Sequence, residues 1–170
     1  MISAIVAVDA NWGIGFDGEL LERIPEDMKR FRELTEKSNI VMGRKTWDSL
    51  PKKPLINRPN IIITHGETRV VPNQPIMFIN LDEAKECLNR AKSWYWQRND
   101  LFIIGGGQIY KQLLPYCDRV YVTKIHKAYE NVDTYFPVDL DESPEWRQVE
   151  TGEVREYNSI TYNFLTYERV

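Results

Sequence analysis

Short runs of apolar, mostly β-branched residues recur along the chain and alternate with segments of helical periodicity. The runs that we interpret as strands are 2–8, 40–42, 61–64, 76–79, 101–104 and 120–125. The segments that we interpret as helices are 25–36, 45–50, 82–96 and 108–114. Strands that alternate with helices are typical of α/β proteins, in which crossover helices make neighbouring strands parallel. The alternation therefore predicts a mostly parallel central sheet with flanking helices.

The C-terminal part departs from this alternation. Residues 146–156 and 160–167 have the pattern of two strands joined by a tight turn at Asn158 and Ser159. Strands joined by such a turn are antiparallel, so we expect an antiparallel hairpin at the C-terminal edge of the sheet. With 170 residues and 42% hydrophobic composition, the chain is long enough for one buried core. We therefore predict one α/β domain over residues 1–170.

Composition excludes several classes of function. The net charge is -3 and no long basic run occurs, so we expect no nucleic-acid partner. Cys87 and Cys117 lie far apart, and the chain has only two histidines, His65 and His126, so we expect no disulfide framework and no metal site. The first residues lack the features of a signal peptide or a membrane span, which favours a cytoplasmic protein without a membrane partner.

A carboxylate occurs where the pattern predicts an apolar side chain. Residues 24–34 have an apolar stripe at helical spacing, formed by Ile24, Met28, Phe31 and Leu34. The offset from Ile24 places Asp27 on the same stripe. Burial of a carboxylate costs free energy unless it is paired, hydrogen-bonded or protonated, so Asp27 is a candidate for proton chemistry.

The same carboxylate has a purely structural interpretation. Pro25, Glu26 and Asp27 also fit the first turn of a helix, where proline is tolerated and acids interact favourably with free N–H groups. This segment alone leaves both interpretations open.

The first glycine-rich turn is a poor candidate for a nucleotide site. Gly13, Gly15 and Gly18 match the spacing of the dinucleotide-binding fingerprint, but that motif needs a helix that begins within it. The next predicted helix begins only at Pro25. We therefore expect residues 13–24 to form a mobile, irregular loop over the end of the first strand.

The second glycine-rich turn is better placed. The strand 101–104 leads directly into Gly105, Gly106 and Gly107 and then into a helix, so bare backbone meets a helix N-terminus. This arrangement suits a pyrophosphate, although tight packing between strand and helix would also require glycine.

A third turn joins the strand 40–42 to a helix through Gly43, Arg44, Lys45 and Thr46. Two cations at a helix N-terminus oppose the helix dipole, and an anionic ligand would relieve that conflict. A solvated basic pair is the structural alternative.

Together, these motifs resemble dihydrofolate reductases of the bacterial chromosomal type. The resemblance covers nearly the whole chain and rests on residues 5–9 with 13–15, 25–31, 41–51, 58–62, 103–110 and 133–137. It implies NADPH-dependent reduction of 7,8-dihydrofolate to 5,6,7,8-tetrahydrofolate, by hydride transfer to C6 and protonation at N5. This reaction supports one-carbon and thymidylate metabolism. The resemblance also implies a monomer that binds diaminopyrimidine and pteridine antifolates.

The resemblance further implies the residues of a substrate site. Asp27 would be catalytic and would hold the amino group and a ring nitrogen of the pterin, while Arg58 would pair with the glutamate tail. Thr123 would assist Asp27 through a water molecule. The implied substrate-binding residues are Ile5, Asp27, Met28, Phe31, Leu50, Leu55, Arg58, Ile104 and Thr123. Ionised Asp27 would orient the pterin and favour N5 protonation by a water that enters through residues 13–24.

The cofactor in the resemblance is NADPH. Arg44, Thr64 and His65 correspond to the region of its 2′-phosphate, and Gly105 and Gly106 would be joined by a cis peptide bond. The implied cofactor-binding residues are Ala7, Ile14, Gly15, Leu20, Gly43, Arg44, Lys45, Thr46, Thr64, His65, Ile104, Gly105, Gly106, Gly107, Gln108, Ile109 and Tyr110.

The sequence departs from the family pattern at two places. Many relatives have Leu-Pro-Trp where this chain has Leu20, Leu21 and Glu22, and a hydroxyl residue is frequent where this chain has His65. Three other functions remain as alternatives: a reductase of the same fold that acts on a riboflavin precursor, a nucleotide-binding module without catalysis, and a scaffold without a ligand. Neither of the last two requires Asp27.

Overall fold

The computed structural model describes residues 1–91 and 100–170. The predicted parallel strands are confirmed, with small changes at their ends. They are β1 (Ile2–Val8), β4 (Asn39–Gly43), β5 (Asn60–Thr64), β7 (Ile76–Asn80), β8 (Leu101–Gly105) and β9 (Arg119–Ile125). In the sheet they follow the order β9-β1-β8-β4-β5-β7, and every neighbouring pair is parallel.

The predicted helices are also confirmed where the structure describes them. They are α1 (Pro25–Thr35), α2 (Arg44–Ser49), α3 (Leu81–Ala91) and α4 (Gly107–Leu113), and a short 3-10 helix, η1 (Leu114–Tyr116), follows α4. The last part of the predicted helix 82–96 lies outside the described residues. Within residues 1–91 and 100–170, no helix is long and apolar enough to cross a membrane.

Both edges of the sheet are antiparallel. The predicted C-terminal hairpin is confirmed: β12 (Arg155–Tyr157) and β13 (Ile160–Arg169) pair across Asn158 and Ser159, which both have positive φ. The predicted strand 146–156 is interrupted at residues 152–154, so it forms two strands rather than one. The strand β13 also pairs with β9, and β11 (Trp146–Thr151) lies on its other side. At the opposite edge, β6 (Arg69–Val70) pairs with β7. The sequence did not predict β6, because two exposed residues carry no apolar pattern.

A small second sheet replaces part of the predicted irregular loop. It contains β2 (Gly13–Phe16), β3 (Glu19–Leu20) and β10 (Thr134–Tyr135) in the order β10-β2-β3. The expectation of irregular structure over residues 13–24 was therefore wrong for most of this segment. Asp17 and Gly18 turn the chain between β2 and β3 with φ of 51° and 77°, as in a tight hairpin turn that favours the Asp-Gly sequence.

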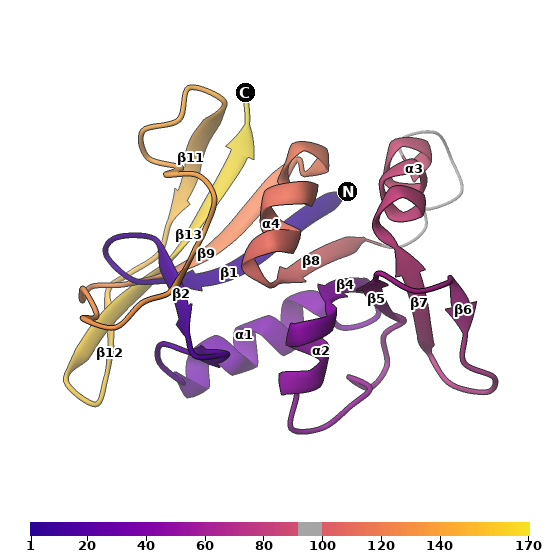
Figure 1. Ribbon diagram of the computed structural model, residues 1–170. Coiled ribbons are helices and arrows are strands. Elements are labelled where there is room, and N and C mark those ends of the chain that lie inside the picture. The colour runs from indigo at the N-terminus through magenta and orange to yellow at the C-terminus, as the bar shows by residue number, and fades with distance from the viewer. Residues whose placement is uncertain (92–99) are drawn as a thin grey trace.

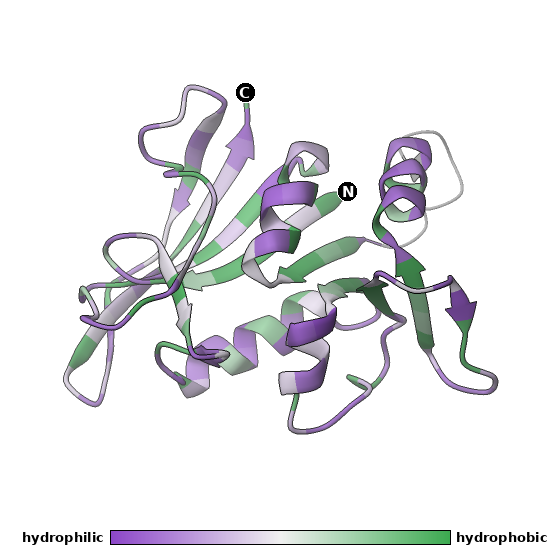
Figure 2. Ribbon diagram, viewed as in Figure 1, coloured by the Kyte–Doolittle hydropathy of each residue, from purple (hydrophilic) through white to green (hydrophobic). Residues whose placement is uncertain are grey.

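Helices cover both faces of the central sheet, with α3 and α4 on one face and α1 and α2 on the other (Figure 1). Alternate residues of each strand point to opposite faces, so Ala4 and Val6 of β1 join the core under α3 and α4, whereas Ile5 joins the core over α1 and α2. The central strands are largely apolar, and the helices carry polar residues on their outer surfaces (Figure 2).

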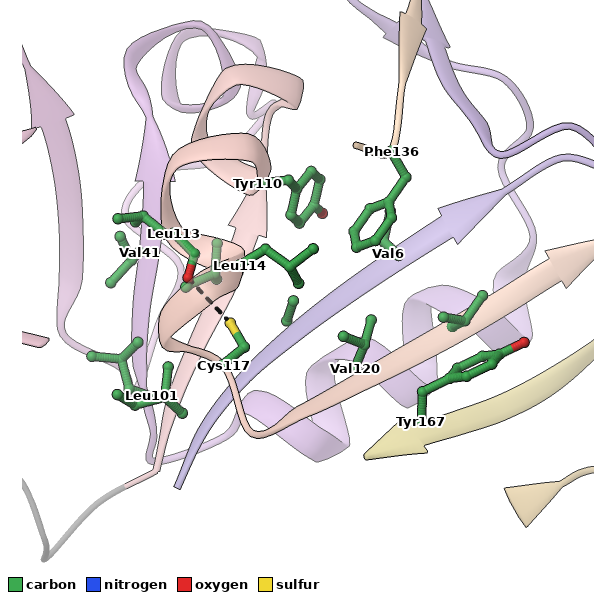
Figure 3. Packing of buried hydrophobic residues seen from close by; sticks show 14 of the residues in the cluster. Val6, Val41, Leu101, Tyr110, Leu113, Leu114, Cys117, Val120, Phe136 and Tyr167 are labelled. Atoms are coloured by element: carbon green, nitrogen blue, oxygen red, sulfur yellow. Dashed lines mark hydrogen bonds between the residues drawn. The ribbon is translucent and has the colours of Figure 1, made fainter. Parts of the chain in front are cut away.

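The larger core cluster lies on the α4 side (Figure 3). Leu113 and Leu114 pack there with Val120, and the thiol of Cys117 donates to the Leu113 carbonyl oxygen at 3.6 Å. Because the six central strands are parallel, their carboxyl ends share one edge of the sheet. Loops at such an edge commonly carry ligand sites in α/β proteins.

Candidate active site

Asp27 lies in the first turn of α1, and its side chain reaches the sheet. The helix begins at Pro25, with Glu26 and Asp27 as acids of the first turn, so the structural interpretation of this segment also holds. The hydroxyl of Thr123 on β9 donates to Asp27 Oδ1 at 2.5 Å, and Thr123 is buried. The structure joins these side chains directly, whereas the resemblance implied a contact through water.

Burial and two neighbouring side chains determine the pKa of the Asp27 carboxyl. Desolvation raises the pKa of its carboxyl, while the Thr123 hydroxyl and the positive charge of Arg30 lower it. Tyr110 of α4 lies close enough for the charge of Asp27 to raise its pKa, although burial is the larger cause. The Tyr110 hydroxyl donates to the Ile5 carbonyl oxygen at 2.7 Å. A carboxyl whose pKa is perturbed by desolvation and by a specific charged neighbour is typical of functional sites.

An apolar surface adjoins this carboxyl. Phe31 of α1 packs against the core cluster that contains Ile5, and three further predicted substrate residues do the same: Leu50, Leu55 and Ile104. All four are half-buried. Met28 differs, because 37% of its side chain is exposed and it lies outside the cluster. The predicted core-facing stripe is therefore wrong at Met28.

Arg58 is a buried cation beneath this surface. Its Nε donates to the Ile56 carbonyl oxygen at 2.8 Å and its Nη1 donates to Thr35 Oγ1 at 2.9 Å. No carboxylate within residues 1–91 and 100–170 forms an ion pair with it. Burial lowers the pKa of its guanidinium. The charge of Glu36 acts on Arg58 without forming an ion pair with it, and a buried cation without an ion-pair partner is costly, so the position favours an anionic ligand.

The two glycine-rich turns come together at the ends of β4 and β8. A Cβ added to Gly43 would lie 2.8 Å from Ile109 Cγ1, and one added to Gly106 would lie 3.4 Å from Thr46 Oγ1. A Cβ added to Gly107 would lie 2.7 Å from Thr134 Cγ2. The peptide bond between Gly105 and Gly106 is cis, as the resemblance implied. The two turns, residues 43–46 and 105–107, thus form one backbone-lined surface, which we call the cradle.

Basic side chains border this cradle. Arg44 lies 5.5 Å from the centroid of the Phe78 ring, and its Nε is 3.3 Å from Asp48 Oδ1. Lys45 is exposed and Thr46 is half-buried. Arg69 of β6 lies 4.3 Å from the centroid of the same Phe78 ring.

The remaining predicted cofactor residues on this side have fewer contacts. Thr64 Oγ1 accepts the Gly66 N–H at 3.1 Å, and His65 is exposed at the end of β5. In α4, Gln108 is exposed, whereas Ile109 is half-buried against the larger core cluster.

The end of β1 and the small sheet form the other border. Ala7 is half-buried beside Thr123, its register partner on β9. Ile14 is half-buried against the larger core cluster and Gly15 is buried, whereas Leu20 is 48% exposed. The structure therefore brings Ala7 and Ile14 toward the strand ends and leaves Leu20 at the surface.

Buried Asp9 anchors the segment between β1 and α1. Its Oδ1 accepts the Gly13 N–H at 2.7 Å, and its Oδ2 accepts the Tyr129 N–H at 3.2 Å. The Tyr129 hydroxyl donates to Glu22 Oε2 at 2.9 Å, and burial with this bond raises the pKa of the tyrosine. Glu22 stands where many relatives have tryptophan, and in this chain it ties the segment to Tyr129.

Sequence reasoning missed three of these contributors: Arg30, Arg69 and Tyr129. Arg30 and Tyr129 contact partners more than 100 residues away in the sequence, Phe164 and Glu22, whereas Arg69 contacts Phe78 on the neighbouring strand. A lone arginine or tyrosine in a polar segment carries no signal of such a contact.

Comparison with known proteins agrees with this geometry. Residues 1–169 match the profile of the family described as Dihydrofolate reductase. The chain is 39% identical to the dihydrofolate reductase of Bacillus subtilis, over 99% of this chain and 95% of that protein. It is 36% identical to that of Mycobacterium tuberculosis, over 99% and 98%. It is also 36% identical to the bifunctional dihydrofolate reductase-thymidylate synthase of Glycine max, over 98% of this chain but 33% of the plant protein. The chain therefore belongs to the dihydrofolate reductase family, a family of oxidoreductases that reduce dihydrofolate to tetrahydrofolate.

Proposed function

We propose that this enzyme reduces 7,8-dihydrofolate with NADPH and that Asp27 is the carboxylate on which the reaction depends. The main support is the position of Asp27, which is desolvated and bound to a buried hydroxyl beside a half-buried apolar surface. Burial of a carboxylate costs the fold free energy, and such carboxylates are concentrated at functional sites.

Asp27 would orient the pterin. Its Oδ1 already accepts the Thr123 hydroxyl, and none of the described residues donates a hydrogen bond to Oδ2. The free oxygen would accept hydrogen bonds from the pterin amino group and a ring nitrogen. Phe31, Leu50 and Leu55 would pack against the ring system and its benzoyl extension, with Ile5, Met28 and Ile104 at its borders.

Arg58 would hold the glutamate tail of the substrate. Thr35 and the Ile56 carbonyl fix two of its nitrogens, Nη1 and Nε, and leave Nη2 for a carboxylate. A planar guanidinium with a fixed orientation is well suited to a carboxylate partner.

The glycine cradle would hold the pyrophosphate of the cofactor. Gly43 and Gly107 pack too closely against Ile109 and Thr134 to carry a Cβ, so backbone is exposed at the turns, and Lys45 and Thr46 add a cation and a hydroxyl next to it. Backbone N–H groups and cations at helix starts are common partners of phosphate groups. NADPH supplies the hydride that reduces C6 of the substrate.

The two ends of the cofactor would lie on opposite sides of this cradle. Arg44, Thr64 and His65 would contact the 2′-phosphate, with Arg69 nearby. Ala7, Ile14, Gly15 and Leu20 would border the nicotinamide, together with Ile104. The remaining turn residues, from Gly105 through Gln108 and Ile109 to Tyr110, would shape the cradle itself.

Ionised Asp27 would favour protonation at N5 without donating the proton itself. Its negative charge stabilises the positive charge that the pterin gains when N5 is protonated. The proton would come from a water that enters beside residues 13–24, which Asp9 and Tyr129 hold at the end of β1.

We also propose the physiological setting implied by the family resemblance. The enzyme would act as a monomeric single domain in the cytoplasm, would support thymidylate synthesis, and would bind diaminopyrimidine and pteridine antifolates at Asp27. Cys87 and Cys117 both carry thiols, which suits a reducing compartment.

The direct test is an assay of the purified protein with dihydrofolate, using NADPH or NADH and following loss of the reduced-nicotinamide absorbance. We expect turnover with a preference for NADPH, and a rate lower by about 10²-fold or more in Asp27→Asn. The matched control is Asp48→Asn, which removes an exposed carboxylate near the cradle. Full activity of Asp27→Asn at neutral pH would reject the proposed role of Asp27, and equal use of NADH would reject the cofactor choice.

A further inference from the structure

Arg30 lies one helical turn after Asp27 and is held between two aromatic rings. Its guanidinium carbon is 4.4 Å from the centroid of the Phe164 ring and 5.6 Å from that of Tyr121. Within residues 1–91 and 100–170, no acceptor forms a hydrogen bond or an ion pair with it. The rings therefore fix the position of this charge while leaving its N–H donors uncommitted.

The two rings also place Arg30 next to the Asp27 contact. Tyr121 and Thr123 are two residues apart on β9 and face the same side of the sheet. Phe164 of β13 is the register partner of Thr123, the residue that donates to Asp27. Residues three apart on a helix are neighbours, at about 5–6 Å between Cβ atoms. Asp27 and Arg30 thus rest on adjacent side chains of one sheet face.

The guanidinium also has access to solvent. A groove of about 220 Å³ separates α1 from the C-terminal strands and is lined by Glu26, Lys29, Arg30, Glu33, Arg155 and Phe164. Burial lowers the pKa of Arg30 from the ordinary arginine value, but arginine remains charged in any solution near neutrality. Arg30 therefore carries a permanent positive charge beside Asp27.

We propose that Arg30 is a positioning residue for the reaction, whose fixed charge keeps Asp27 ionised although Asp27 is desolvated. This inference rests on the proposed role of Asp27. Without the charge, burial would leave Asp27 protonated over more of the working pH range, and the carboxylate that orients the pterin would be lost.

Other charged groups near this pair do not replace Arg30. Glu26 lies 3.6 Å from Arg155 of β12, and Glu150 of β11 acts on Arg30 rather than on Asp27. Two tyrosines also sense the charge of Asp27, Tyr110 of α4 and Tyr162 of β13. Both have a pKa raised above that of an ordinary phenol and therefore stay neutral near neutral pH.

The test is a titration of the Asp27 side-chain carboxyl by ¹³C NMR in the ligand-free protein. The resonance is identified by its absence in Asp27→Asn. We expect the Arg30→Gln midpoint to lie about one pH unit above that of wild type. Arg30→Lys keeps the charge and should return the midpoint toward wild type. Lys29→Gln removes one positive charge from the neighbouring exposed position and should leave the midpoint unchanged.

An unchanged midpoint in folded Arg30→Gln would overturn the inference, and so would an equal shift in Lys29→Gln. If Arg30→Gln does not fold, Arg30→Met keeps an apolar stem over the two rings and allows the same comparison. The activity of Asp27→Asn separates the two proposals. If Asp27→Asn has the wild-type rate, the role of Asp27 is rejected. If Asp27→Asn is slow but the titration midpoint in Arg30→Gln is unchanged, only the role of Arg30 is rejected.

Discussion

The proposed substrate side and the proposed cofactor side of the site are built in different ways. At the α1 side, the site consists of charged side chains in places where burial opposes charge, namely Asp27 and Arg58. At the cradle, the site consists of glycine backbone. A Cβ on Gly43 would lie only 2.8 Å from Ile109 Cγ1, and one on Gly107 only 2.7 Å from Thr134 Cγ2. The first side therefore depends on the charge of its side chains, and the second depends on the close packing of its backbone. Substitutions on the first side should change ligand binding and chemistry, whereas those on the second should also weaken the fold.

The largest effect that we expect on the substrate side follows from Arg58→Leu. Loss of one partner of a buried charge pair costs about 2–5 kcal/mol, so the dihydrofolate Kd should rise by about two orders of magnitude. The NADPH Kd should stay near the wild-type value. Thr35 keeps its own bond to the Phe31 carbonyl oxygen, which limits damage to the fold. Titration calorimetry with each ligand measures both effects.

A dihydropterin without the glutamate tail is the matched ligand for this variant. Wild type and Arg58→Leu should bind it equally. An equally large loss with the truncated ligand would mean that Arg58 acts through the fold rather than through the tail.

The cofactor side should respond differently to Gly43→Ala. The new methyl would meet Ile109 Cγ1 at 2.8 Å, and such overpacking costs about 1–3 kcal/mol of unfolding free energy. NADPH binding should weaken at the same time, with little change for dihydrofolate. Gly66→Ala is the control, because its Cβ would have an ordinary 3.6 Å contact with Thr64 Oγ1. If urea unfolding gives Gly43→Ala and Gly66→Ala the same free energy of unfolding, the packing around Gly43 is looser than we describe.

Thr123→Val should have a smaller effect, confined to the chemistry. Loss of the hydroxyl removes a hydrogen bond that lowers the pKa of Asp27, so Asp27 stays protonated up to a higher pH in the variant than in wild type. We expect hydride transfer to slow by about tenfold or more at pH values where Asp27 is protonated in the variant but ionised in wild type, because a hydrogen bond to a charged group is worth about 1.5–3 kcal/mol. The deficit should shrink as pH rises and Asp27 ionises again.

Thr166→Val is the control for that measurement, since Thr166 is a buried threonine of β13 that donates to Glu150 instead. Single-turnover rates across pH compare the two variants. A deficit in Thr123→Val that is independent of pH would contradict the electrostatic explanation.

The smallest effect that we expect concerns the segment that connects the two sides. Tyr129→Phe removes the bond to Glu22, which should cost about 1 kcal/mol and increase hydrogen exchange over residues 13–24. Tyr135→Phe, at an exposed tyrosine of β10, should leave exchange unchanged. Equal exchange in Tyr129→Phe and wild type would show that Asp9 alone holds the segment.

The sequence allowed the central sheet to be predicted, because buried parallel strands are continuous β-branched runs such as Ile61–Ile63. Short strands at the surface lack that pattern, and β6 was missed for this reason. The β2–β3 hairpin was also missed, although Asp17 and Gly18 carry the signal of a tight turn. There the glycines were interpreted as irregular structure.

The same contrast applies to the candidate site. Asp27 stands out in the sequence because a carboxylate interrupts an apolar stripe, and each glycine turn stands out because glycine follows a strand. The meeting of Gly43 with Ile109 depends on β4 and β8 lying side by side, which no local pattern encodes. Arg30 was overlooked because its aromatic partners are 91 and 134 residues away in the sequence, at Tyr121 and Phe164.

We expect the burial of ionised Asp27 to destabilise the ligand-free fold. A carboxyl whose pKa is raised by folding binds protons more tightly in the folded state, so unfolding free energy falls as pH rises from the unfolded value toward the folded pKa. The most direct measurement is urea unfolding of ligand-free wild type and Asp27→Asn at a series of pH values. We predict that Asp27→Asn is the more stable protein above the folded pKa and that its advantage disappears as pH falls below the unfolded value. An Asp27→Asn variant that is less stable than wild type at high pH would show that ionised Asp27 does not destabilise the ligand-free fold.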